Sequence, residues 1–102
     1  MKHLVLIIHD NLKMDIADLF RNMEKVQGFT FSSVEGHAVQ TEEDAFFSAR
    51  DKVEGYTPRV RVDLILEDQN VPQVLSELRN SSIGLGKHGI YWITTVEEYG
   101  HF

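Results

Sequence analysis

The chain contains no cysteine, and this absence removes several kinds of chemistry at once. It excludes a disulfide framework, a thiolate metal site and a cysteine nucleophile. Basic residues are also few, because 10 Lys and Arg stand against 16 Asp and Glu and give a formal net charge of −6. Sequence-independent binding of DNA or RNA depends on neutralising phosphates with Lys and Arg. We therefore expect no nucleic-acid partner, while one local basic pocket stays compatible with the composition.

Long hydrophobic runs are missing as well. The apolar run near the N-terminus, residues 4–8, is far too short for a signal sequence or a membrane span. We expect a protein that is not embedded in a membrane, with the cytoplasm as its default location. The 102 residues suffice for a single domain, residues 1–102, with one modest core. A content of 42% apolar and 25% charged residues is typical of a soluble globular protein.

Two strands and a helix are predicted in the first third of the chain. Residues 3–8, HLVLII, are almost entirely aliphatic, which is typical of a strand buried on both faces. A helix should follow, with Asp10 or Asn11 as its N-cap and Gly28 as its stop. Residues 29–35 form the second predicted strand. The helix is indicated by apolar residues at three- and four-residue spacing: Leu12, Ile16, Leu19, Phe20, Met23 and Val26.

The second half of the chain repeats this order. Residues 58–67 alternate as a strand, and residues 89–96 are rich in β-formers and predict the last strand before a polar tail. Between them, Asn70 as a cap with Gln73 three residues later marks a helix start. The strand at 58–67 places Val60, Val62, Leu64 and Leu66 on one face and Arg59, Arg61 and Asp63 on the other.

The order of these elements predicts the fold class. It reads β-α-β, a long connection, and again β-α-β, which is the pattern of an α+β domain of ferredoxin-like type, βαββαβ. Such a domain has a four-stranded antiparallel sheet with two helices on one face. The uncovered face carries aromatic groups, so we expect it to pack against a partner such as a second copy. Tyr91 and Trp92 are adjacent, so one should face the core and the other an interface. The alternative is that they form a wall of a ligand cavity.

The connection between the two halves, residues 36–57, has no clear period. Connections longer than about 12–15 residues without structure are uncommon in compact domains and usually have a function. This one contains an acidic patch and two adjacent aromatic residues, Phe46 and Phe47. We interpret it as an arm that contacts a partner or closes over a ligand. The alternative is a β-extension or a short helix that decorates the sheet.

A second unusual segment is the loop IGLGKHG at residues 83–89. Glycines allow backbone N–H groups to converge on a phosphate, and one lysine supplies a cation, although three glycines also suit a plain tight turn. With the element order and the long connection, this loop makes the whole chain resemble the PII signalling superfamily. SSIGLGKHGI resembles the family's T-G-x-I-G-x-G-K-I, VEGHA its V-x-G-x-G, PRVRVD its P-K-V-K-I-E, and VQGFT its V-x-G-M-T.

The resemblance implies a homotrimer that senses a small molecule, such as an adenine nucleotide, in clefts between subunits. It implies that the 36–57 loop contacts a partner such as a membrane transporter. Ala38 departs from the family's second glycine, and the ending VEEYGHF lacks the arginines that reach a nucleotide phosphate in classical members. The chain looks most like a PII-like subfamily found beside heavy-metal efflux genes. The implied phosphate-binding residues are Gly36, Arg59, Arg61, Gly84, Gly86 and Lys87.

Histidines suggest a different ligand. Imidazole is the commonest metal ligand in proteins, and His37, His88 and His101 lie in or near the two loops and the acidic tail. A divalent metal such as zinc or copper would suit them, as would a more distant resemblance to the CutA trimers linked to metal tolerance. They lack a short His-x-x-His spacing, so solvated loop histidines are the simpler interpretation. His9 follows the first strand beside Asp10 and is expected to form local hydrogen bonds.

The chain carries no recognisable catalytic motif, neither a G-x-S-x-G nor a P-loop. Small dimeric α+β-barrel monooxygenases share this element order and chain length. That interpretation needs a cavity between the helices and the sheet, and the apolar stripes look continuous instead. We therefore predict a non-enzymatic PII-like regulator, with a CutA-like metal-binding protein and a monooxygenase-like enzyme as alternatives.

Overall fold

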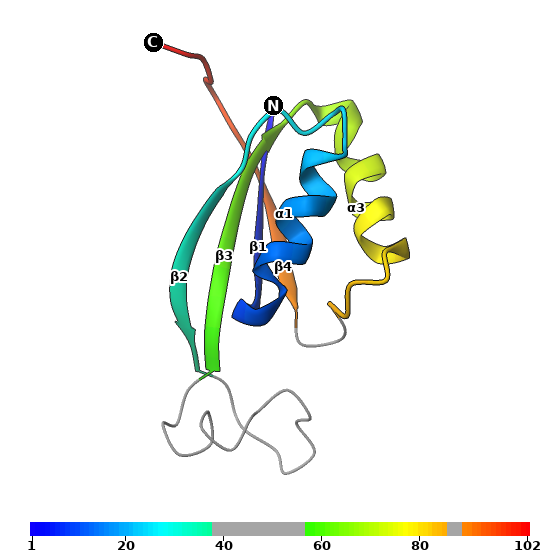
Figure 1. Cartoon of the computed structure of the whole chain (residues 1–102). Coiled ribbons are helices and arrows are strands. Elements are labelled where there is room, and N and C mark those ends of the chain that lie inside the picture. The colour runs from blue at the N-terminus through cyan, green and yellow to red at the C-terminus, as the bar shows by residue number, and fades with distance from the viewer. Residues whose placement is uncertain (38–56, 86–88) are drawn as a thin grey trace.

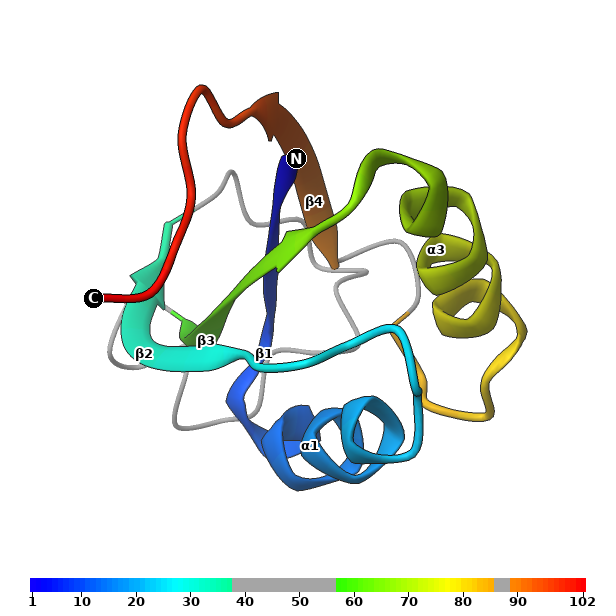
Figure 2. The ribbon, with the colours of Figure 1, turned by 90° about the horizontal axis from the view of Figure 1, so that it is seen from above.

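The computed structural model of this chain describes residues 1–37, 57–85 and 89–102. Its four strands form one antiparallel sheet in the order β2-β3-β1-β4, and both helices lie on the same face (Figures 1 and 2). This confirms the predicted α+β fold of ferredoxin-like type. The elements are β1 (Lys2–His9), α1 (Lys13–Arg21), β2 (Thr30–Gly36), β3 (Thr57–Leu66), α3 (Val71–Asn80) and β4 (Ile90–Thr95).

The first strand is central because it pairs with β3 on one side and with β4 on the other. Leu4 lies opposite Leu64 of β3 and Ile93 of β4. Both edges of β1 are therefore hydrogen-bonded within the sheet, which suits a nearly continuous aliphatic run. Val5, whose side chain points to the face without helices, is as fully buried as Leu4 on the helix side. The strand is covered on both faces at this level, as the run predicts.

The core lies between the sheet and the two helices. Phe20 of α1 is fully buried, and its ring centroid is 5.5 Å from that of Phe29, which precedes β2. Burying a large apolar side chain contributes about 1.5–3 kcal/mol relative to leaving it in water. The alternating residues predicted for β3 all face this core. Its buried members are Leu4, Leu6, Ile8, Ile16, Phe20, Met23, Val60, Val62, Leu64, Leu66, Val71, Val74 and Leu78.

The first helix is shorter than its apolar stripe predicts. It ends at Arg21, and two turns continue the chain, with the Met23 amide donating to Phe20 and the Val26 amide donating to Met23. Met23 is buried and Val26 is half-buried, so the turns keep the periodicity that the helix began. Gly28 is outside the left-handed region, and the prediction that it ends the helix was wrong.

The two predicted N-caps had different outcomes. The residue at the N-cap position of α1 is Leu12, so the prediction of Asp10 or Asn11 was wrong, whereas Asn70 stands at the N-cap position of α3 as predicted. Each helix is preceded by a single 3-10 turn, residues 10–12 before α1 and residues 68–70 before α3. At the first, the imidazole of His9 accepts a hydrogen bond from the Asn11 amide at 3.3 Å, which confirms the local role expected for His9. At the second, the Asn70 side chain forms no capping hydrogen bond. The 3-10 turns already engage the first backbone groups, so a side-chain cap is not required there.

The last strand differs from the other three in its exposure. Every residue of β4 is exposed, including four large apolar ones, Ile90, Tyr91, Trp92 and Ile93. It forms one edge of the sheet, so its outer backbone groups have no strand partner among the described residues. Within the part of the chain that the structure describes, no helix is long and apolar enough to cross a membrane.

Candidate functional site

The two loops singled out from the sequence leave the sheet at the same end. Gly36 at the end of β2 pairs with Thr57 at the start of β3, and Ile7 near the end of β1 pairs with Ile90 at the start of β4. Figure 1 shows these strand ends at one end of the sheet and the C-terminus beyond the opposite one. Of the predicted loop residues, Gly86, Lys87, His88, Phe46 and Phe47 lie outside the described residues.

Gly36 and Arg59, two of the predicted phosphate-binding residues, lie against each other at the base of the long connection. A Cβ atom added to Gly36 would lie 2.8 Å from Cγ of Arg59 and 3.0 Å from its Nε. Real Cβ atoms essentially never approach this closely. The missing side chain of Gly36 thus makes room for the arginine to cross β2, so the guanidinium stays at the loop end of the sheet.

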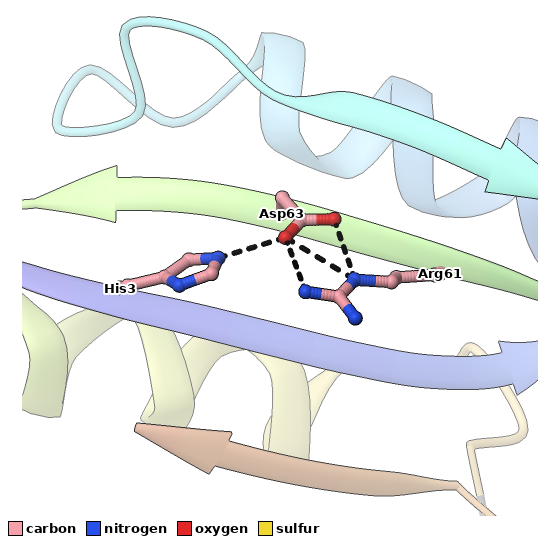
Figure 3. Close-up of polar contacts among 3 residues, drawn as sticks. All are labelled: His3, Arg61 and Asp63. Atoms are coloured by element: carbon pink, nitrogen blue, oxygen red, sulfur yellow. Dashed lines mark hydrogen bonds and ion pairs between the residues drawn. The ribbon is translucent and has the colours of Figure 1, made fainter. Parts of the chain in front are cut away.

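Arg61, the second predicted arginine, is directed elsewhere. Its Nε donates to Oδ1 of Asp63 at 3.0 Å, and one terminal nitrogen donates to Oδ2 at 3.0 Å (Figure 3). The guanidinium carbon is 5.7 Å from the centroid of the Trp92 ring, close enough for a cation–π interaction. Arg61 is therefore held in the middle of the uncovered face and is not brought to Gly36.

His3 completes a cluster of three charged or ionisable side chains on this face. Its Nε2 lies 2.7 Å from Oδ2 of Asp63, so the carboxylate is shared between β1 and β3 (Figure 3). The hydrogen bonds from Arg61, and less strongly the one from His3, hold the pKa of Asp63 below its usual range. The Asp63 bond in turn raises the pKa of Arg61. His3 and Asp63 retain about a quarter of their exposure, at 27% and 26%.

The sequence did not single out this cluster. Two-residue alternation places Arg61 and Asp63 on one face of β3. It does not determine which residues of β1 and β4 lie beside them in the sheet. That depends on the register, in which Val5 stands opposite both Asp63 and Trp92. The one available signal was an aspartate and an arginine two residues apart in a strand whose other face is apolar.

The glycine loop begins in the described part of the chain with Gly84. Nothing lies within 4 Å of the position that its Cβ would take, so Gly84 faces open space. The amide of Leu85 donates to Ile83 at 2.7 Å, and the amide of Gly89 donates to Leu85 at 3.1 Å. The first bond closes a tight turn at the start of the loop, and the second joins the two described ends of the loop, an arrangement that the simpler interpretation also requires.

Of the predicted metal ligands, the structure describes His37 and His101, and these two lie at opposite ends of the sheet. His37 lies at the loop end, where its Nε2 is 3.2 Å from Oε2 of Glu35. His101 lies beyond the other end of the sheet, where it contacts Tyr99 and lines a broad cavity of about 1030 Å³ beside Met1. Among the described residues, no three His, Asp or Glu side chains form a group that could hold a metal ion.

The helix side of the sheet has a groove that the sequence did not predict. It lies between α3 and β4, has a volume of about 310 Å³ and is open to solvent. Tyr91 points to this side and accepts a hydrogen bond from Arg79, while Trp92 points to the uncovered face. The two aromatic residues thus point to opposite faces as expected, but Tyr91 is 48% exposed and lines the groove instead of entering the core.

Sequence comparison places the chain in a family. Residues 1–102 match the model of a family described as a protein of unknown function, DUF3240. The chain belongs to the DUF3240 family. Among curated proteins, no match was found.

Two solved structures share the fold of this DUF3240 chain. One is a DUF3240 family protein from Shewanella baltica, with a TM-score of 0.76 and 20% identity, covering 99% of this chain and 94% of that one. The other, from Thermus thermophilus, is described as a PII-like signalling protein. It has a TM-score of 0.61 and 11% identity, covering 91% and 83% of the two chains. The resemblance to the PII-like superfamily is confirmed at the level of the fold.

Proposed function

We propose that this DUF3240 protein is a non-enzymatic, PII-like homotrimeric regulator. It senses a small anionic molecule, such as an adenine nucleotide, at the end of the sheet where the two loops leave. It then contacts a partner, such as a membrane transporter, through the 36–57 loop. The observation that carries the proposal is the contact of Gly36 with Arg59, which keeps a cation at the base of that loop.

The second support comes from the other loop. Gly84 opens toward space at the same end of the sheet, and the sequence adds Gly86 and Lys87 beyond it. Backbone N–H groups without Cβ atoms nearby, together with two cations from different elements, suit the phosphates of a nucleotide. Arg61 is not needed for this site, because Asp63 already engages it. The proposed set is therefore Gly36, Arg59, Gly84, Gly86 and Lys87.

The exposed last strand supports an assembly. An edge strand whose outer backbone groups lack a strand partner among the described residues, and which exposes four large apolar side chains, is normally covered in a stable protein. The uncovered face next to it carries Trp92 over a charge cluster that is neutralised within the chain. A second copy covers both without burying an unpaired charge, and the PII-like resemblance supports an assembly of three copies.

Native mass spectrometry tests the proposal directly. The protein as purified should give a trimer, and added ATP, ADP or AMP should give up to three adducts per trimer. Arg59→Gln should weaken nucleotide uptake at least about ten-fold, since a charge-assisted contact to phosphate is lost. Arg21→Gln is the matched control, because Arg21 lies on α1 away from both loops.

Two outcomes would count against the regulator. A dimer or a monomer would remove the clefts between three subunits. A trimer that ignores nucleotides but takes up zinc or copper would favour the CutA-like alternative, with His37 and Glu35 as the first residues to substitute because they already lie together at the loop end.

A further inference from the structure

The groove between α3 and β4 has a mainly apolar lining. It is lined by Leu6 and Ile8 of β1, Leu75 and Leu78 of α3, and Tyr91 of β4. Leu75 is half-buried, while Ile90 and Tyr91 are 55% and 48% exposed. The exposed side chains along the groove are apolar, so a ligand that covers them removes hydrophobic surface from water.

One cation stands at this groove. Arg79, in the last turn of α3, is the single charged residue among the described residues that line it. A terminal nitrogen donates to the Tyr91 hydroxyl at 2.9 Å, and the guanidinium carbon is 5.8 Å from the centroid of that ring. Tyr91 thus fixes the arginine at the groove without neutralising it. A guanidinium has five N–H donors, which leaves most of them available to a carboxylate from outside.

The volume limits the size of a ligand. About 310 Å³ is at the lower end of the range for small-molecule pockets. At about 30 Å³ for each water-sized group, it accommodates about ten non-hydrogen atoms. That size excludes a nucleotide and suits a short amphipathic molecule.

We propose that this groove binds a small amphipathic carboxylate, a medium-chain or aromatic acid of about ten non-hydrogen atoms. Its apolar body lies against Leu75, Leu78 and Leu85, and its carboxylate pairs with Arg79. This site is separate from the nucleotide site proposed above. It lies on the helix side of the sheet and uses none of the residues Gly36, Arg59 or Gly84.

The position of the groove connects such a ligand to the glycine loop. Ile83, Leu85 and Gly89, from the two described ends of that loop, also line it. Gly89 is packed tightly, because a Cβ there would lie 3.1 Å from the Leu85 carbonyl oxygen and 3.7 Å from Cγ2 of Ile8. A bound acid therefore restrains both ends of the loop, and the Gly89 amide, which donates to Leu85, should exchange its hydrogen more slowly.

Isothermal titration calorimetry of the full chain with sodium octanoate tests the proposal. Octanoate has about ten non-hydrogen atoms, and we expect saturable binding at one site per chain with a Kd below about 1 mM. Octanol, which has the same chain without the charge, should bind at least about ten-fold more weakly. Hydrogen exchange with and without octanoate should show slower exchange at Gly89.

Two pairs of variants make the test specific. Arg79→Gln should reduce octanoate affinity to that of octanol, whereas Arg21→Gln, also in the last turn of its helix, should change nothing. Leu75→Phe fills the groove and should abolish binding of both molecules. Leu19→Phe on α1, half-buried against the same core, is its control. Circular dichroism and thermal unfolding establish that each variant is folded before it is titrated.

Three results would overturn the proposal. The first is an absence of saturable binding by the native chain up to about 10 mM octanoate, about ten-fold above the expected limit. The second is equal affinity for octanoate and octanol with no effect of Arg79→Gln, which would mean that the arginine does not recognise the ligand. The third is binding that appears only after the assembly is dissociated by dilution, since a second copy would then be the native occupant of the groove.

Discussion

The glycine at position 36 is explained by its close contact with Arg59 and not by a turn. It lies within β2, where the side chain of Arg59 occupies the space that a Cβ would need. A glycine inside a strand costs about 0.5–1 kcal/mol relative to alanine, so its presence indicates that the close approach has a use. The use that we infer is to hold a guanidinium at the base of the 36–57 loop.

Gly36→Ala should therefore displace Arg59 and lower the free energy of unfolding by about 1–3 kcal/mol, as over-packing does. It should also weaken nucleotide uptake to the level of Arg59→Gln. Gly28→Ala is the control, because nothing lies within 4 Å of its Cβ position and its backbone is not left-handed. That variant should leave nucleotide uptake unchanged and raise stability by about 0.4–1 kcal/mol. Urea unfolding of both variants measures whether stability falls in Gly36→Ala and rises in Gly28→Ala. Equal losses of stability in the two variants would contradict the role given to the Gly36–Arg59 contact.

Asp63 is the other residue whose environment makes a measurable prediction. Its pKa is lower in the folded chain than in the unfolded one, mainly because of Arg61 and to a smaller extent because of His3. Unfolded Asp63 thus binds more protons in the acid range. The stabilisation that it provides is complete above about pH 4, the ordinary value of an aspartate, and is lost as the pH falls through the lower folded pKa.

Asp63→Asn should remove this dependence. At about pH 7 the variant should be less stable by about 1 kcal/mol, a modest loss because the cluster is partly exposed. Between about pH 5 and about pH 2.5, the decline in the stability of the native chain should be steeper than that of the variant. Urea unfolding across this range measures both slopes. Parallel slopes would show that Asp63 does not contribute to the acid sensitivity.

At the scale of the elements, β4 is the strand that the rest of the described chain covers least. The other edge strand, β2, has mostly polar or small residues, including Thr30, Ser32 and Ser33. In contrast, β4 combines an open backbone edge, as far as the described residues extend, with large apolar side chains on both faces. Polar edge strands resist further pairing and apolar ones promote it, so the asymmetry supports the proposal that another copy joins at β4.

The helices show how far a local pattern extends. The apolar stripe of α1 continues through Met23 and Val26, although the helix itself ends at Arg21. Apolar residues at three- and four-residue spacing can face the core whether the backbone forms a helix or a series of turns. A stripe therefore predicts which residues are buried more securely than it predicts where a helix stops.

At the scale of the whole molecule, the two ends of the sheet differ in content. The end with the loops carries Arg59, Gly84 and His37, while the C-terminal tail with Tyr99 and His101 lies beyond the other (Figure 1). The uncovered face between them carries Trp92 and the Asp63 cluster. An assembly through β4 and this face leaves the loop end free for a ligand and a partner.

Trp92→Ala should weaken that assembly. Trp92 is 39% exposed on the uncovered face, and aromatic residues at the centre of interfaces often contribute about 2 kcal/mol or more, so we expect the dissociation constant to rise about 30-fold or more. Met14→Ala is the control, since Met14 is 64% exposed on α1, away from the sheet. Sedimentation over a range of concentrations measures both. Unchanged assembly in Trp92→Ala would place the interface elsewhere.

The sequence by itself determined the strands, the antiparallel α+β fold, the buried face of β3 and the opposite directions of Tyr91 and Trp92. These follow from local periodicity, because successive side chains of a strand point to opposite faces. The sequence also indicated the two loops. The proposal that the loops act together stays a prediction, because Gly86, Lys87 and His88 lie outside the described residues.

Only the tertiary structure decided which groups meet. Arg61 turns to Asp63 instead of the loop end, His3 reaches the same carboxylate from β1, and Arg79 reaches Tyr91 over the groove. Each contact depends on strand register or on the distance between a helix and an edge strand, and both are set by the packing of distant segments. Local patterns assign residues to faces, and the packing of the whole chain places those faces together.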